Sequence, residues 1–301
     1  MRMEKIDDSA ADQRIDNFLL RLCKGVPKSH IYRILRSGEV RVNSRRVDAS
    51  YRLRNGDAVR VPPIRIAERD DARAAPPAEF PVLWEDDALL AIDKPSGVAV
   101  HGGSGVSFGA IEQLRQARPG SRFLELVHRL DRETSGVLLL AKKRPALVAM
   151  HELLRTGGTD KRYLALVKGR WTKPSLKVDV ALHKYVNAAG ERRVSVNSEG
   201  QRALTLLRLK RAWNEASLLE ATLKTGRTHQ IRVHLAHLGY PICGDGKYGD
   251  FPFNHELARR GLRRMFLHAS RLAFVHPLSG AKIAIEAPLP ATLAEFLLQL
   301  E

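Results

Sequence analysis

An aspartate between two arginines is the residue of this chain best suited to chemistry. Asp131 lies between Arg129 and Arg132, within the stretch His128–Gly136. Neighbouring cations favour the ionised form of a carboxyl group. A turn rich in Thr, Ser and Gly then leads into the apolar run Val137–Leu140, which predicts a buried strand that holds the carboxylate on a rigid base. Taken alone, such an aspartate more often caps a turn or forms an ordinary ion pair.

A second segment, Lys161–Gly169, places a tyrosine on a predicted strand. Side chains alternate between the two faces of a strand, so Tyr163, Ala165 and Val167 are expected on one face and the intervening leucines on the other. On its own, a tyrosine at such a position is an ordinary sheet residue with its hydroxyl at the rim.

The third segment, Lys224–Leu235, predicts a basic helix over 228–238 with Thr228 as its N-cap. Arg232 falls on the first turn. Arg227 stands beside the helix N-terminus, where the helix dipole disfavours a cation, so it needs an anionic partner. The alternative is a helix whose basic residues are merely solvated. Three apolar residues are expected to face the core, namely Ile231, Leu235 and Leu238.

The composition of the chain indicates what kind of partner it binds. The chain has 301 residues, 44% of them hydrophobic, and its net charge of +17 points to a polyanionic partner, although a protein can be basic without binding one. No apolar run is long enough to span a bilayer, and the first ten residues lack a secretory signal. Cys23 and Cys243 lie far apart, which argues against a disulfide framework and fits a cytoplasmic protein.

Residues 14–66 form the most basic block, with thirteen Lys and Arg against four acidic residues. The pattern predicts two short helices, the second opened by Pro27. Short strands follow at Val40–Val42 and Ala58–Val61, with Asn55–Asp57 as a turn. This arrangement resembles the RNA-binding domain shared with ribosomal protein S4. The alternative is a small basic domain that packs on the main domain and does not bind RNA. The expected RNA-docking residues are Lys28, Arg33, Arg36, Arg45 and Arg46.

The remaining chain predicts a larger α+β domain. Residues 67–79 are rich in Ala, Pro and charged residues, which predicts a linker. The predicted domains are therefore 1–66 and 80–301. Strands outnumber helices without regular alternation, which favours a mixed, mainly antiparallel sheet. The predicted strands are Val82–Trp84, Ala88–Ile92, Val137–Ala141, Tyr163–Val167, Leu204–Leu209 and Leu218–Leu223, and the predicted helices are 107–117, 144–155, 228–238, 255–263 and 291–300.

These segments together resemble the RluA/RluC-type pseudouridine synthases, which convert uridine in RNA to its C-glycoside isomer. The resemblance implies that Asp131 is the essential catalytic residue, that Tyr163 stacks on the base and helps remove its C5 proton, and that Arg232 pairs with the carboxylate. It further implies that Arg129 fills the space of the flipped base, the alternative being a second ion pair to Asp131. Substrate-binding roles are expected for His128, Arg129, Arg227 and His229, and the stretches Leu90–Gly97, His101–Gly105, Leu238–Asp245 and Phe266–Ala269 extend the resemblance over nearly the whole chain.

The implied function is isomerisation of uridines in 23S ribosomal RNA, free or in an assembling large subunit, at several sites near the peptidyl-transferase region. The reaction involves no net redox change, so neither a cofactor nor a metal is expected. The resemblance leads us to expect a cytoplasmic monomer that does not bind membranes.

Three other classes of protein have some support in the sequence. His229, His234 and His237 lie close in sequence, but their spacing is not that of a zinc site. A glycoside hydrolase needs a second carboxylate, for which Glu133 is the nearest candidate in sequence. The basic N-terminal block alone would suit a non-catalytic RNA-binding factor for ribosome assembly.

Overall fold

We describe a computed structural model of the chain over residues 2–7, 10–23, 25–64, 75–103, 106–121 and 123–300. Most of the predicted linker, and part of the His101–Gly105 loop, lie outside these residues. The buried apolar residues form separate clusters, one drawn entirely from residues 6–61 and the others from residue 80 onward. Each part therefore has its own hydrophobic core.

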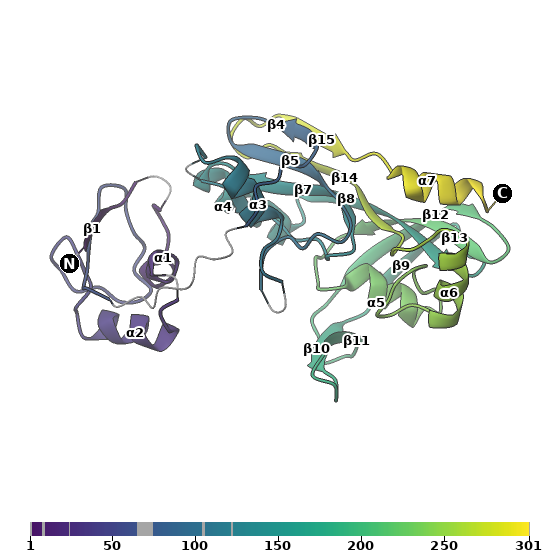
Figure 1. Cartoon of the computed structure of the whole chain (residues 1–301), viewed down its shortest axis with the longest axis horizontal. Helices are drawn as coiled ribbons and strands as arrows, with labels where there is room; N and C mark the ends of the chain where they lie inside the picture. The colour runs from purple at the N-terminus through teal and green to yellow at the C-terminus, as the bar shows by residue number, and fades with distance from the viewer. Residues whose placement is uncertain are drawn as a thin grey trace.

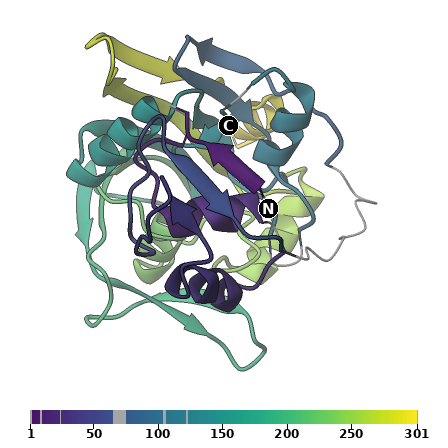
Figure 2. The same ribbon diagram turned by 90° about the vertical axis from the view of Figure 1, so that its left-hand side faces the viewer.

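The N-terminal part is a three-stranded antiparallel sheet packed on two helices (Figures 1 and 2). Both predicted helices are present, and the second begins directly after Pro27. The first strand was not predicted, because its residues are mostly exposed and show no clear alternation. The elements are β1 (Arg2–Lys5), α1 (Ile15–Leu22), α2 (Lys28–Arg36), β2 (Arg41–Val42) and β3 (Ala58–Val61).

A ten-stranded sheet forms the larger part, in the order β4-β5-β7-β14-β8-β13-β12-β9, with β15 paired to β14 and β6 to β7. Its pairs are antiparallel except for β7 with β14, so the sheet is mixed and mainly antiparallel, as predicted. The strands are β4 (Val82–Glu85), β5 (Leu89–Lys94), β6 (Glu125–Leu126), β7 (Ser135–Ala141), β8 (Thr159–Lys168), β9 (Ser175–Asp179), β12 (Leu204–Ala212), β13 (Ala216–Leu223), β14 (Leu267–Val275) and β15 (Lys282–Glu286).

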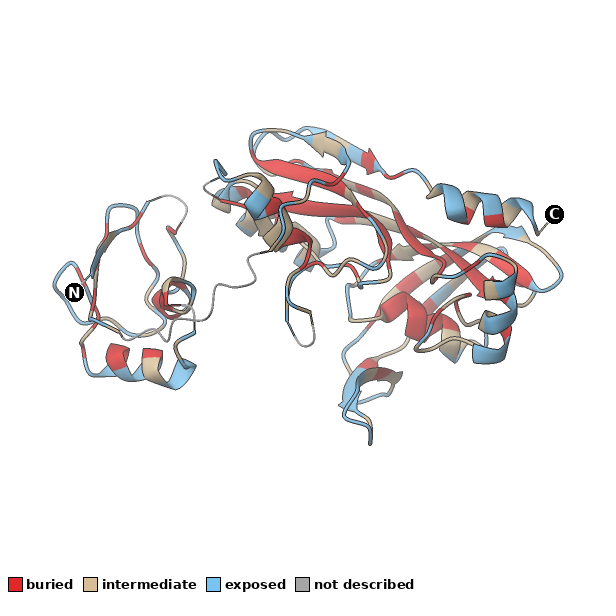
Figure 3. Cartoon of the chain, viewed as in Figure 1, coloured by how far each residue is buried: buried red, intermediate tan, exposed pale blue. Residues whose placement is uncertain are grey.

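Helices cover both faces of this sheet. Apolar residues of α3 (Ala110–Ala117) and α5 (Gln230–His237) share a core cluster with Tyr163, Ala165 and Val167. Leu166 points the other way and joins the cluster of α6 and α7, which confirms the predicted alternation along β8. Figure 3 shows the central strands buried beneath these helices. The other helices are α4 (Arg144–Thr156), α6 (Phe251–Arg259) and α7 (Ala291–Leu298).

Three predicted helices begin at other residues, and the one predicted over 107–117, α3, begins at Ala110. The helix predicted over 255–263 is α6 and begins at Phe251, because the Asp250 side chain accepts a hydrogen bond from the Phe253 amide and so caps an earlier turn. The helix predicted from Thr228 begins at Gln230. Its N-cap is His229, whose backbone is left-handed with φ 54°, so Thr228 does not cap it.

A second small sheet stands apart from the main one. Strands β10 (Leu182–Val186) and β11 (Arg192–Val196) form a hairpin that projects below α5 in Figure 1. Its base packs on Val233 of α5 and on Tyr248. The sequence did not predict this hairpin, because its outward side chains are largely polar and exposed.

Candidate active site

The loop that carries Asp131 joins β6 to β7 and forms one wall of a cavity of about 630 Å³. A buried lysine of β5 holds this loop. The Lys94 ammonium donates to the carbonyl oxygens of Pro95, Val98 and Arg132 at 2.7, 2.8 and 3.1 Å. Burial lowers the pKa of Lys94 to about 7. Because its donors are satisfied by backbone, Lys94 ties the residue that follows Asp131 to the segment that follows β5.

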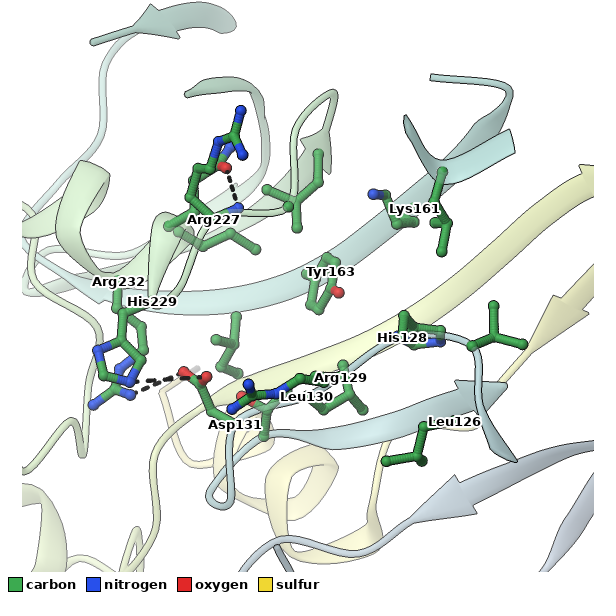
Figure 4. A pocket seen from close by; sticks show the side chains of 18 of the residues that line it. Leu126, His128, Arg129, Leu130, Asp131, Lys161, Tyr163, Arg227, His229 and Arg232 are labelled. Carbon is green, nitrogen blue, oxygen red and sulfur yellow. Dashed lines mark hydrogen bonds and ion pairs between the residues drawn. The ribbon is translucent and has the colours of Figure 1, made fainter. Parts of the chain in front are cut away.

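Arg232 binds the Asp131 carboxylate from the opposite wall, as predicted (Figure 4). Its Nη1 lies 2.9 Å from Asp131 Oδ2, while its Nε and Nη2 each lie 2.8 Å from an oxygen of Asp245. Burial opposes the charge of this guanidinium, but the hydrogen bonds and charges of the two aspartates outweigh burial and raise its pKa. Arg232 therefore stays charged and is held in one plane beside Asp131.

Asp245 is a functional residue that the sequence did not reveal. Its side chain is fully buried, and its Oδ1 also accepts from the amides of Lys247 and Tyr248 at 2.8 and 3.0 Å. Burial alone would raise the pKa of Asp245, but Arg232 and the two amides lower it overall. The only signal was an acid at the end of the stretch Leu238–Asp245, with nothing to indicate its partner.

The arginines next to Asp131 in sequence do not bind it. Arg132 pairs with Glu133 at 2.8 Å, and the Arg129 side chain, which is exposed, makes no hydrogen bond or ion pair within the described residues. The cation in contact with the Asp131 carboxylate is Arg232 of α5 instead. The alternative role of Arg129, a second ion pair to Asp131, was therefore wrong. Arg129 lines the cavity and is free to meet a ligand. Glu133 is taken up by Arg132 and supplies no second catalytic carboxylate.

Tyr163 lines the same cavity from β8, and Figure 4 shows it between Asp131 and Lys161. Its side chain is nearly buried. Burial, and secondly the negative charge of Asp131, raise the pKa of the phenol. Tyr163 is therefore an uncharged ring that faces the space in front of the carboxylate.

The predicted substrate-binding residues all line this cavity, but they differ in their exposure and in their hydrogen-bond partners. His128 accepts a hydrogen bond at Nε2 from the Leu139 amide at 3.1 Å, and burial lowers its pKa to about 4, so it is a neutral structural ring. Arg227 is exposed, and its Nε donates to the Arg202 carbonyl at 3.1 Å rather than to an anion. His229 faces Asp131, with its Nε2 3.9 Å from Oδ1.

The five predicted RNA-docking residues are all exposed on α2 and on the loop after β2. Arg33 pairs with Glu39 at 3.1 Å, and Arg46 donates to the Ser37 carbonyl at 2.5 Å, so these two have partners within the protein. The other three, Lys28, Arg36 and Arg45, form no ion pair within the described residues and are available to phosphates.

The described residues contain no group of His, Cys, Asp and Glu that could hold a metal ion, and none of their helices is long and apolar enough to cross a membrane. His234, one of the three clustered histidines, instead contacts Thr205 Oγ1 at 2.9 Å. Both cysteines are buried and free.

Comparison with known proteins assigns this fold and cavity to a class, the RNA-modifying isomerases. Residues 88–237 match the model of the RNA pseudouridylate synthases, and residues 13–59 match that of the S4 domain. The chain is 52% identical to ribosomal large subunit pseudouridine synthase C of Yersinia pestis, over 98% of this chain and 94% of that one. It is 50% identical to the protein of the same name from Escherichia coli (strain K12), over 100% and 97%.

Solved structures agree. Human RNA pseudouridylate synthase domain containing 4 matches with a TM-score of 0.61 and 25% identity, over 73% of this chain and 92% of that one. The chain belongs to the RNA pseudouridylate synthase family and is a pseudouridine synthase, with an S4 domain before its catalytic part. Its substrate is RNA.

Proposed function

We propose that this enzyme converts specific uridines of 23S ribosomal RNA to pseudouridine, at several positions near the peptidyl-transferase region, with Asp131 as the catalytic residue and no cofactor. The observation that carries the proposal is the Asp131 carboxylate, which Arg232 holds at 2.9 Å in a cavity that Tyr163 also lines. Two relatives of about the same length as this chain are named for the ribosomal large subunit.

The residues suit the bonds that must change. The reaction breaks the bond from N1 to C1′, turns the base, and joins C1′ to C5. C5 then loses its proton and N1 gains one, so the product is an isomer of uridine. Asp131 attacks C1′ or removes a proton from C2′, and Arg232 keeps it oriented in either case. Tyr163 stacks on the base. The Tyr163 phenol is protonated. Its oxygen can therefore take the C5 proton only if it gives up its own hydroxyl proton to another acceptor at the same time.

RNA must present the target uridine outside its stack, which costs a few kcal/mol. We propose that Arg129, which has no protein partner among the described residues, fills the space the base leaves. Contacts to phosphate offset the remaining cost. Residues 1–66 dock the RNA through Lys28, Arg33, Arg36, Arg45 and Arg46, residues 67–79 act as the linker, and residues 80–301 carry the chemistry. We further propose a cytoplasmic monomer acting on free rRNA or on an assembling large subunit.

Tritium release tests the proposal directly. The wild-type enzyme should release tritium from 23S rRNA labelled at C5 of uridine, and Asp131→Asn should abolish release while RNA binding is retained. Glu133→Gln, an acid of the same loop that pairs with Arg132, is the matched control and should stay active. Mapping pseudouridines in rRNA from cells that lack the protein identifies the positions. An Asp131→Asn enzyme as active as wild type would overturn the catalytic assignment.

A non-catalytic assembly factor would give a different pattern. Such a protein would bind 23S rRNA with no tritium release by the wild type, and cells lacking it would keep every pseudouridine.

A further inference from the structure

His229 is held in an unusual position beside the catalytic carboxylate. Its backbone is left-handed, with φ 54°, which strains any residue with a side chain. This geometry brings Nδ1 to 2.8 Å from the Tyr248 hydroxyl oxygen, and the two rings meet edge to face. The other ring nitrogen, Nε2, faces Asp131. The fold therefore uses a strained residue to hold an imidazole between a phenol and the carboxylate.

The hydrogen bonds of Tyr248 determine which nitrogen of His229 carries the proton. The Tyr248 oxygen accepts from the Val194 amide of the β10–β11 hairpin at 3.0 Å. A phenol has one hydrogen to donate, and among the described residues the acceptor within reach is His229 Nδ1. Burial lowers the pKa of His229, so its ring is neutral. A neutral ring that accepts at Nδ1 carries its hydrogen on Nε2 and points a donor into the cavity.

This donor and the carboxylate leave a gap that fits one particular group. Nε2 and Asp131 Oδ1 are 3.9 Å apart, too far for a direct hydrogen bond. A hydroxyl oxygen placed between them can lie within about 2.8 Å of both, accepting from His229 and donating to Asp131. The ribose 2′-hydroxyl both donates and accepts, and it is the group that distinguishes RNA from DNA.

We propose that His229 and Asp131 together recognise the 2′-hydroxyl of the target nucleotide, and that Tyr248 is a positioning residue that fixes His229 as the donor. The proposal rests on the proposed function, because it places the target ribose at Asp131. It also gives the β10–β11 hairpin a connection to the site, since the Val194 amide holds the Tyr248 oxygen. Tyr248 is further fixed by the Arg232 guanidinium, which lies 5.1 Å from the centre of its ring.

The proton position can be measured without RNA. Long-range ¹H–¹⁵N correlation spectra of the ¹⁵N-labelled full chain should show His229 with its hydrogen on Nε2, assigned by its loss in His229→Gln. In Tyr248→Phe, the hydrogen of His229 should exchange between Nδ1 and Nε2, and the signal should change to that of the mixture. Tyr240→Phe is the matched control, because Tyr240 packs on Trp171 outside the cavity and should leave the signal unchanged. A wild-type His229 with its hydrogen on Nδ1, or a signal that Tyr248→Phe does not alter, overturns the role of Tyr248.

Recognition of the hydroxyl is tested with product RNAs, which do not react further. Short 23S fragments carry either pseudouridine or 2′-deoxypseudouridine at a mapped position, and their dissociation constants are compared. Wild type should bind the 2′-deoxy form about tenfold more weakly, the loss expected for one or two hydrogen bonds. Tyr248→Phe should reduce this ratio to about threefold. In a His229→Gln background, where the amide supplies the donor itself, Tyr248→Phe should have no effect on the ratio.

Equal binding of both RNAs by wild type overturns the recognition of the hydroxyl. A ratio that Tyr248→Phe leaves at its wild-type value overturns the role of Tyr248 in that recognition. Failure of the proposed function looks different. In that case no pseudouridine is found at any position, while the tautomer measurement still reports on the contact between His229 and Tyr248.

Discussion

At the scale of single residues, one arginine serves two carboxylates. Arg232 gives two hydrogen bonds to Asp245 and one to Asp131, and Asp245 is the more deeply buried of the pair. Asp245 therefore sets the plane of the guanidinium, and Asp131, which keeps part of its surface open to the cavity, receives the remaining hydrogen. The arrangement separates the residue that holds the cation from the residue whose carboxylate is open to the cavity.

Replacing Asp245 by Asn should weaken both stability and catalysis. The amide keeps the shape but removes one charge from a buried pair, so we expect a loss of about 2 kcal/mol in unfolding free energy and roughly a tenfold fall in kcat. Urea unfolding and tritium release measure the two effects. Asp179→Asn is the control, since Asp179 forms an exposed ion pair with Arg202 and should cost less than about 1 kcal/mol. Equal effects of the two substitutions would contradict the role of Asp245.

His268 should make stability depend on pH. This fully buried ring contacts Ser135 Oγ at 2.9 Å and the Ala287 carbonyl at 3.2 Å, and burial lowers its pKa from 6.5 to about 4. Between those values the unfolded chain binds a proton that the native chain does not, so stability is full above pH 6.5 and falls as the pH drops toward 4.

Urea unfolding at pH 7, 6, 5 and 4.5 tests this dependence. Between pH 7 and 4.5, the unfolding free energy of His268→Gln should fall by about 2 kcal/mol less than that of wild type, since one pKa unit corresponds to about 1.4 kcal/mol. The exposed His255→Gln should keep the wild-type slope. The same slope in His268→Gln would mean that other groups cause the dependence.

The sequence predicted the contact between Asp131 and Arg232 but not the residues behind it. Both partners stand in motifs with recognisable neighbours. By contrast, the contacts of Asp245 with Arg232 and of Lys94 with the Arg132 carbonyl join residues that the fold brings together from separate segments of the chain. Arg132, although next to Asp131 in sequence, does not contact its carboxylate. Proximity in sequence does not fix the direction of a side chain in a turn, and Arg132 points to Glu133.

At the scale of elements, the parallel pairing of β7 with β14 decides where the Asp131 loop ends. Gly136 pairs with Ala269 at this junction, with φ +109°. A Cβ at Gly136 would lie 2.2 Å from the Ala269 carbonyl oxygen, closer than atoms can approach. The strands can meet here only because the residue is glycine.

Gly136→Ala should therefore push the strands apart and displace the loop. We expect a loss of about 3 kcal/mol or more in unfolding free energy, together with loss of tritium release, because Asp131 would no longer meet Arg232. Gly120→Ala is the control, since a Cβ there would meet no atom within 4 Å. A stable and active Gly136→Ala enzyme would show that the junction adapts.

Strands were predictable where both their faces are apolar or alternate cleanly. The predicted strands within β5, β7, β8, β12 and β13 are of this kind, and each is present. Strand β14 was missed because His268, Ser270 and Arg271 interrupt its apolar pattern, although His268 is buried through its hydrogen bonds. The turn before α5 was misread because the strain at His229 comes from its tertiary contacts rather than from local preference.

At the scale of the whole molecule, charge is divided between two tasks. Cations near the cavity are partly taken up by aspartates, as at Arg232, whereas Lys28, Arg36 and Arg45 on the S4 domain have no acidic partner among the described residues. Exposed, unpaired cations contribute to RNA binding by releasing counterions from phosphates. We therefore expect the salt dependence of binding to come mainly from the S4 domain and the chemistry to be independent of it.

The triple variant Lys28→Ala, Arg36→Ala, Arg45→Ala tests this division. Each lost phosphate contact lowers the slope of log K against log salt by about 0.7 to 0.9, so the triple variant should lower it by about two. Tritium release at saturating RNA should match wild type, because none of the three residues lines the cavity. Fluorescence anisotropy from low to moderate salt gives the slope. Lys173→Ala, Lys210→Ala, Lys282→Ala removes as many exposed charges from the catalytic part, and an equal fall in slope there would show that net charge alone, rather than the S4 domain, governs binding.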